Sequence, residues 1–172
     1  MRHLVCWMII LGSTAVGENW EIDTVFTRLG SLASVAIATD SACLPHVVFS
    51  NTGDHFMEYA SWTGDSWEIE HVESGRPYDD IGFCLDVDEL PHIGYVASYW
   101  PAPGWIHYAH RDGDTWHIET VARGTAAGWL RLRALALARD RTPHMVFIDS
   151  LRVRYTYKAG DSWVILPVPA YQ

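Results

Sequence analysis

A short phrase occurs four times in this chain of 172 residues. Its complete copies begin with glycine and are "GDSWEIEHV" at 64–72, "GDTWHIETV" at 113–121 and "GDSWVILPV" at 160–168, while a shorter copy, "ENWEIDTV", stands at 18–25. A second marker recurs between the copies, as Pro45-His46, Pro91-His92 and Pro143-His144. Two markers in a fixed order indicate a tandem structural unit of about 45–50 residues.

Each complete unit contains four short runs rich in Val, Ile, Phe, Tyr and Trp, separated by turn residues. In the first complete unit these runs are 33–39, 46–50, 56–61 and 67–72. They favour β-strands and are too short for helices. A four-stranded unit of this length in tandem is typical of a β-propeller blade. The sequence therefore predicts an all-β fold with three complete blades, at 26–75, 76–124 and 125–172, plus the outer strand of an incomplete blade at 18–25.

The first run of each unit alternates small and large side chains. The small columns are Ala36, Gly82 and Ala134, then Ala38, Cys84 and Ala136, and the larger Ile37, Phe83 and Leu135 lie between them. This alternation is expected of the crowded strand nearest a propeller axis. Cys84 stands where its repeats have alanine, so we expect a buried small side chain there rather than a disulfide with Cys43.

The repeated phrase itself is predicted to be structural. Gly64, Gly113 and Gly160 supply the positive φ of a tight turn before the fourth strand. Trp20, Trp67, Trp116 and Trp163 then place a large ring in the gap between blades. The histidines that recur once per blade, His46, His92 and His144, are predicted to be hydrogen-bonded structural residues.

Three longer strings carry a resemblance to a known family. They are "AIATDSACLPHVVF", "GFCLDVDELPHIGY" and "ALALARDRTPHMVF", followed by "EYASWTGDSW", "HYAHRDGDTW" and "YTYKAGDSW". In these strings the chain resembles the sialidase-like, Asp-box (BNR-like) propellers, and more closely the bacterial repeat proteins whose blades carry Pro-His, Tyr-Ala and Gly-x-x-Trp. The resemblance covers residues 18–172 and implies a β-propeller. An Asp box has aspartate two residues before the glycine, where this chain has Trp62, Arg111 and Lys158.

The first 17 residues differ from the rest. Arg2 and His3 precede an apolar run from Leu4 to Leu11, and small residues follow up to Gly17. This order is typical of a signal peptide cleaved before Glu18, and it predicts a secreted or periplasmic protein. The run is too short to span a bilayer, so no membrane association is expected. The alternative is that these residues form a buried first strand.

Acidic residues outnumber basic ones. The chain has 21 Asp+Glu and 12 Lys+Arg, a formal net charge of −9. No basic stripe occurs along the sequence, so a nucleic-acid phosphate backbone would be repelled and nucleic acid is not an expected partner.

We expect function at the blade end opposite the Gly-Asp-x-Trp turns, where the longest insert lies. There, Trp100 and Trp105 are stiffened by proline and predict a stacking platform for a carbohydrate or a partner protein. The candidate ligand-binding residues are Arg28, Arg76, Tyr78, Tyr99, Trp100, Trp105 and Arg123. The alternative is that the two tryptophans only cover a blade edge.

Catalysis is the second hypothesis. Sialidases hold a substrate carboxylate with an arginine cluster, and the resemblance implies that Arg28, Arg76 and Arg123 imitate it. A sialidase-like glycoside hydrolase remnant is therefore the alternative to a non-catalytic binding protein. No enzyme motif or cofactor is predicted from the sequence. No metal site is predicted either, because His107 and His110 point to opposite faces of a strand and the acidic turn 86–89 is interpreted as solvated.

Three blades are too few to close a propeller, which has about four to eight. Open ends would expose apolar faces and favour self-association. Two copies would make six blades, so the chain is predicted to be half of a six-bladed ring formed by a dimer. A third hypothesis is a fragment of a longer repeat protein with no function of its own.

Overall fold

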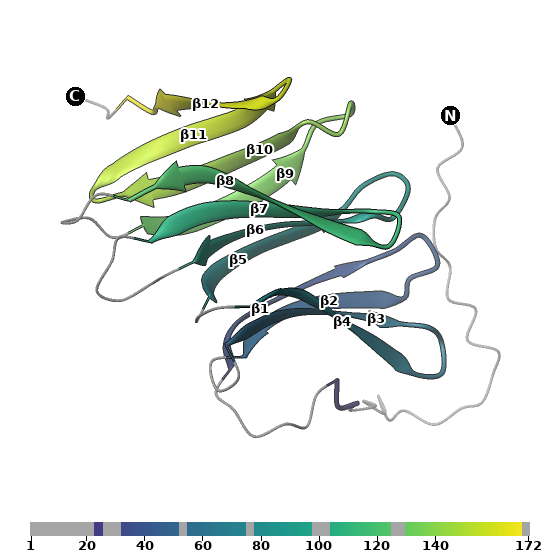
Figure 1. Cartoon of the computed structure of the whole chain (residues 1–172). Coiled ribbons are helices and arrows are strands. Elements are labelled where there is room, and N and C mark those ends of the chain that lie inside the picture. The colour runs from purple at the N-terminus through teal and green to yellow at the C-terminus, as the bar shows by residue number, and fades with distance from the viewer. Residues whose placement is uncertain are drawn as a thin grey trace, which may run out of the picture.

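The computed structural model describes residues 23–25, 32–51, 55–74, 78–97, 104–124 and 130–169. These residues form twelve β-strands and contain no helix (Figure 1). The predicted outer strand at 18–25 and the predicted signal peptide at 1–17 lie outside the described residues, apart from 23–25. The predicted all-β fold class is confirmed.

The twelve strands form three antiparallel sheets of four, each in sequence order. Blade 1 comprises β1 (Leu32–Thr39), β2 (Pro45–Asn51), β3 (Phe56–Trp62) and β4 (Trp67–Ser74). Blade 2 comprises β5 (Tyr78–Leu85), β6 (Pro91–Ala97), β7 (Trp105–Asp112) and β8 (Thr115–Arg123). Blade 3 comprises β9 (Leu130–Leu137), β10 (Pro143–Asp149), β11 (Arg152–Ala159) and β12 (Ser162–Pro167).

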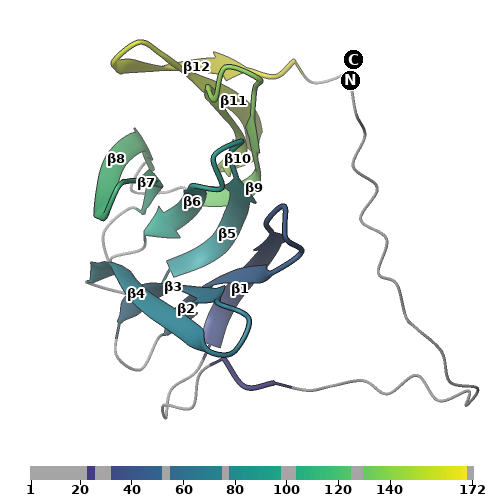
Figure 2. The ribbon, with the colours of Figure 1, turned by 90° about the vertical axis from the view of Figure 1, so that its right-hand side faces the viewer.

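The blades stand face to face like part of a propeller that is not closed. Their first strands, β1, β5 and β9, are neighbours along one side of the array, and the other strands fan outward from them (Figure 2). The described part of the chain is therefore an open array of three propeller-type blades.

Two kinds of turn shape one end of each blade, which we call the turn end. The turns before β4, β8 and β12 contain glycines at positive φ: Gly64 at 104°, Gly113 at 57° and Gly160 at 60°. The turns after β1, β5 and β9 also contain a left-handed residue, which is Cys43, Glu89 or Arg141. The opposite end carries the β6–β7 connection, and we call it the insert end.

The core lies between blades. We call the face that each blade turns toward the next blade its trailing face, and the opposite face its leading face. Val48, Met57 and Tyr59 on the trailing face of blade 1 pack with Ile93 and Tyr95 of blade 2. A second cluster joins the trailing face of blade 2 to blade 3 in the same way, through Val96, Ile106, Tyr108, Val121, Leu132, Met145 and Phe147. Burial of these side chains holds neighbouring blades together.

The first strands approach one another closely. A Cβ added to Gly82 would lie 3.0 Å from Leu135 Cβ and 3.2 Å from its backbone nitrogen. Cys84, two residues along β5, carries a free thiol, so it forms no bridge to Cys43. Burial, reinforced by the nearby Asp86 carboxylate, raises the pKa of this thiol to about 11. Cys84 is therefore a half-buried thiol that is protonated at neutral pH, in a crowded column.

Candidate functional site

Trp105 and Arg123 meet at the insert end of blade 2. Trp105 begins β7, Arg123 ends β8, and the two are opposite one another in the ladder. The Arg123 guanidinium carbon lies 5.6 Å from the centroid of the Trp105 ring, a cation–π geometry. The Gly124 N–H donates to the Gly104 carbonyl at 2.8 Å and fixes the backbone beside this pair. Arg123 is exposed and Trp105 is half-buried, so the ring holds an accessible guanidinium in place.

The other predicted ligand-binding residues are not brought together by anything described. Arg28, Arg76, Tyr99 and Trp100 lie outside the described residues, as does the repeat tryptophan Trp20. Tyr78 begins β5, but its side chain also lies outside what is described. Trp105 and Arg123 are therefore the described part of the predicted site.

The turn end holds a repeated histidine–tyrosine pair. In each blade the Nδ1 of the Pro-His histidine and a tyrosine hydroxyl share a hydrogen bond: His46 with Tyr59 at 2.5 Å, His92 with Tyr108 at 2.5 Å and His144 with Tyr155 at 2.6 Å. Burial raises the pKa of Tyr59 to about 12 and also raises that of Tyr108, so both hydroxyls are neutral. The histidine of each blade thus bonds across its own sheet.

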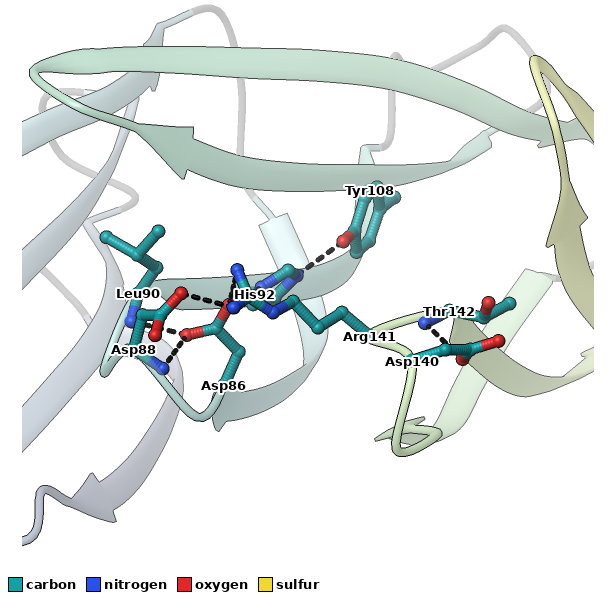
Figure 3. A network of polar contacts seen from close by, with 8 residues as sticks. All are labelled: Asp86, Asp88, Leu90, His92, Tyr108, Asp140, Arg141 and Thr142. Carbon is teal, nitrogen blue, oxygen red and sulfur yellow. Dashed lines mark hydrogen bonds and ion pairs between the residues drawn. The ribbon is translucent and has the colours of Figure 1, made fainter.

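In blade 2 this pair extends into a wider network (Figure 3). The Nε2 of His92 lies 3.6 Å from Asp86, whose carboxylate also accepts the N–H groups of Asp88 and Leu90 at 2.8 and 2.9 Å. Arg141 of blade 3 pairs with both Asp86 and Asp88. Burial opposes ionisation of Asp86, but the two N–H donors, His92 and Arg141 outweigh it and lower its pKa. This network joins the turns of blades 2 and 3.

A hollow of about 300 Å³ lies between the same two turns. Its walls are Leu85, Asp86, Val87, Leu137, Ala138, Arg139 and Arg141. At the turn position where blade 1 has Asp40 and blade 2 has Asp86, blade 3 has Ala138. The hollow lies at the turn end, away from the end where sequence reasoning expects a ligand.

The indole of each outer-strand tryptophan donates to a carboxylate of the preceding repeat. Trp116 Nε1 donates to Glu70 at 3.2 Å, and Trp163 Nε1 donates to Glu119 at 3.1 Å. A cation two residues before the turn glycine pairs with the same carboxylate: Arg111 with Glu70 at 2.7 Å, and Lys158 with Glu119. Every blade-to-blade junction in the described array therefore contains one indole, one cation and one carboxylate.

Sequence reasoning missed these carboxylates, although a signal was present. Each lies three residues after a repeat tryptophan, in "WEIE" and "WHIE". The same position in "WEID" is Asp23, which accepts the Trp67 indole N–H at 2.9 Å. The last copy reads "WVIL" and has Leu166 there. The pattern thus has a carboxylate in three copies and an apolar residue in the fourth.

Another missed contact lies between blades 1 and 2. The Tyr95 hydroxyl donates to Glu73 at 2.7 Å, and His107 Nδ1 lies 3.4 Å from the same carboxylate oxygen. The Glu73–Tyr95 pair leaves no local sequence signal, because the two residues belong to different units. Tyr95 is fully buried, so its hydroxyl is out of reach of a substrate in this structure.

The described residues contain neither a metal-binding group nor a membrane-spanning helix. No group of three or more His, Cys, Asp or Glu side chains there is arranged to hold a metal ion. Within the same ranges, no helix is long and apolar enough to cross a membrane.

Comparison with protein-family models and with curated proteins finds no match for the chain. The class of protein is therefore defined by its architecture: a propeller-like repeat array.

Proposed function

We propose that this chain is a secreted, non-catalytic propeller segment that binds a carbohydrate at the insert end of blade 2. The observation that carries the proposal is the Trp105–Arg123 pair, an aromatic ring with an exposed guanidinium held over it. An aromatic ring is a surface on which a sugar can stack. A guanidinium recognises a carboxylate through two parallel N–H donors. The ligand class that uses both groups is an acidic oligosaccharide.

The family resemblance stays part of this proposal. It is supported by the order of the Pro-His, Tyr-Ala and Gly-x-x-Trp markers, and the described blades are compatible with it. A tyrosine nucleophile must reach its substrate, and Tyr95 is fully buried, so the Glu73–Tyr95 pair gives no support to a sialidase-like remnant.

The test is titration calorimetry with an acidic oligosaccharide and a neutral oligosaccharide of the same length. We expect the acidic one to bind preferentially. Arg123→Ala should weaken its binding at least about tenfold, because a charge-assisted hydrogen bond contributes about 1.5–3 kcal/mol. Arg123→Lys keeps the charge but loses the planar fork, and we expect it to weaken binding as well.

Arg139→Ala is the matched control, since it removes an exposed arginine at the turn end. It should leave binding unchanged. Equal binding of the neutral and acidic sugars, or acidic-sugar binding that survives Trp105→Ala combined with Arg123→Ala, would show that this pair is not the site.

A further inference from the structure

The trailing face of blade 3 has the pattern of an internal junction but has no blade behind it in the described array. Met57, Ile106 and Val153 occupy the same position on the trailing faces of blades 1, 2 and 3. The first two side chains are 0% exposed, whereas Val153 is 40% exposed. At a second position Val72 and Val121 are 6% and 7% exposed, whereas Val168 is 44% exposed. This face has the apolar side chains of a surface that is normally buried.

One substitution separates this face from the other two. A row of paired residues crosses each trailing face: Ala36, Val48, Tyr59 and Glu70 in blade 1; Gly82, Gly94, Tyr108 and Glu119 in blade 2; and Ala134, Val146, Tyr155 and Leu166 in blade 3. The carboxylate at the outer end of the row becomes Leu166, which is 43% exposed. The adjacent row of blade 3 is Ala136, His144, Tyr157 and Val164. Neither row of blade 3 contains a carboxylate, a lysine or an arginine.

The missing carboxylate decides what fits against this face. A further blade of the internal kind would bring an indole N–H and a cation, and Leu166 offers no acceptor for either. Burying an unpaired indole N–H and an unpaired cation is unfavourable. The matching surface is therefore apolar and uncharged along these rows, and the trailing face of blade 3 itself has that composition.

The leading face of blade 1 is a poorer match. Asp23 already accepts the Trp67 indole N–H there, and Val25 packs against the cluster of Val47, Phe49 and Ala60. The place that a preceding outer strand would fill is thus occupied by the chain's own residues. A head-to-tail contact between two copies, which the six-bladed ring expected from the sequence requires, would have to displace them.

We propose that two copies of this chain associate through the trailing faces of their third blades, related by a two-fold axis that brings the two Leu166 side chains together. A two-fold contact uses the same patch on both subunits, so the patch must be self-complementary, and the two uncharged rows around Leu166 meet that condition. This contact is independent of carbohydrate binding, because the Trp105–Arg123 pair lies in blade 2 at the insert end.

The experiment is light scattering after size exclusion, over a range of protein concentrations, on wild type and on Leu166→Glu. This substitution restores the residue type of Glu70 and Glu119, so it suits the strand. We expect wild type to have twice the mass of one chain. Leu166→Glu should be a monomer with a dissociation constant raised at least about 100-fold, because like charges facing each other across an interface cost several kcal/mol.

Ile165→Glu is the matched control. Ile165 precedes Leu166 in β12, points to the other face of the sheet and is 41% exposed, close to the value for Leu166. It should leave the dimer intact. A wild-type monomer at every concentration, or dissociation by Ile165→Glu as well, would overturn the proposal.

A charge swap tests the two-fold axis directly. Leu166→Lys should also be a monomer, and mixing it with Leu166→Glu should restore a dimer that contains one of each variant. In a head-to-tail contact the two positions never meet, so mixing would restore nothing. Failure of the mixture to associate, or dissociation of the wild-type dimer by Ile37→Glu on the leading face of blade 1, would likewise reject this arrangement.

Discussion

Gly82 lies in β5 at a position where the other two blades have alanine. Its repeats, Ala36 and Ala134, suggest that alanine is acceptable there. The structure places the Cβ of an alanine at Gly82 3.0 Å from Leu135 Cβ and 3.4 Å from a methyl carbon of Leu132. Gly94, beside it in β6, is similarly crowded by Met145 Sδ at 2.9 Å. The glycine pair lets blade 3 approach blade 2 closely.

We therefore predict that Gly82→Ala is destabilising although it copies the repeat. The free energy of unfolding should fall by about 1–3 kcal/mol, the usual effect of overpacking. Urea denaturation of the variant and of wild type measures this difference. Gly82 does not have a positive φ, so the loss would come from packing and not from the backbone. Equal stability of the two proteins would mean that blade 3 can move away at little cost.

At the scale of single elements, three neighbouring strands of blade 2 place histidines side by side. His92 of β6, His110 of β7 and His117 of β8 are paired in register, with ring centroids 6.0 and 5.3 Å apart. Burial lowers the pKa of His92, and the nearby Asp86 only partly offsets it. Burial and then the neighbouring His117 lower the pKa of His110, whose Nδ1 is buried without a hydrogen-bond partner. Both shifts favour the neutral imidazole.

This row predicts that the fold loses stability in mild acid. Since the pKa values of His92 and His110 are lower in the folded than in the unfolded state, the unfolded chain binds more protons once the pH falls below about 6.5. Stability should thus be constant between about pH 7 and 8 and should decline as the pH falls through 6 toward the folded-state values. Urea midpoints between pH 8 and 5 measure the decline.

His110→Asn should reduce the pH dependence, because it removes one of the two titrating rings. His55→Asn changes an exposed histidine at the insert end and should keep the wild-type profile. A profile that is flat from pH 8 to 5, or one that His110→Asn leaves unchanged, would contradict the assignment of the decline to this row.

The strands themselves were largely predictable from local sequence. In blade 1 the predicted runs at 33–39, 46–50, 56–61 and 67–72 correspond to β1 through β4, whose ends lie within two residues of the prediction. This agreement is expected, because strand propensity and turn glycines act over a few residues. The register shift inside β1, between Leu32 and Val35, was not predictable, since it depends on how β1 pairs with β2.

At the scale of the whole molecule, the junctions between blades combine apolar packing with a shared carboxylate. Glu119 of blade 2 receives the Trp163 indole N–H and the Lys158 ammonium of blade 3. The Trp163 ring also packs edge-on against Tyr108, with the two centroids 5.3 Å apart. In a repeat array each blade contacts only its neighbours, so the stability of a junction contributes directly to that of the whole.

Removal of this carboxylate should weaken the junction between blades 2 and 3. Glu119→Ala leaves a half-buried indole N–H and an ammonium without their acceptor, and we expect a loss of about 1–3 kcal/mol in the free energy of unfolding. Glu68→Ala removes an exposed glutamate from β4 and should change it by less than about 0.5 kcal/mol. Urea denaturation compares the two variants. Equal effects would mean that the shared carboxylate adds nothing to apolar packing.

The sequence by itself determined the unit of this fold: four strands per repeat, glycine turns before each fourth strand, and a tryptophan at a fixed place. These features follow from propensities and periodicities that act within one repeat. Only the tertiary structure decided how the repeats meet. Trp116 and Glu70 are 46 residues apart, and Trp163 and Glu119 are 44 apart, so their contacts exist only when two blades stack. The same stacking gives Leu166 its significance, because the absence of a carboxylate matters only where a neighbouring blade would need one.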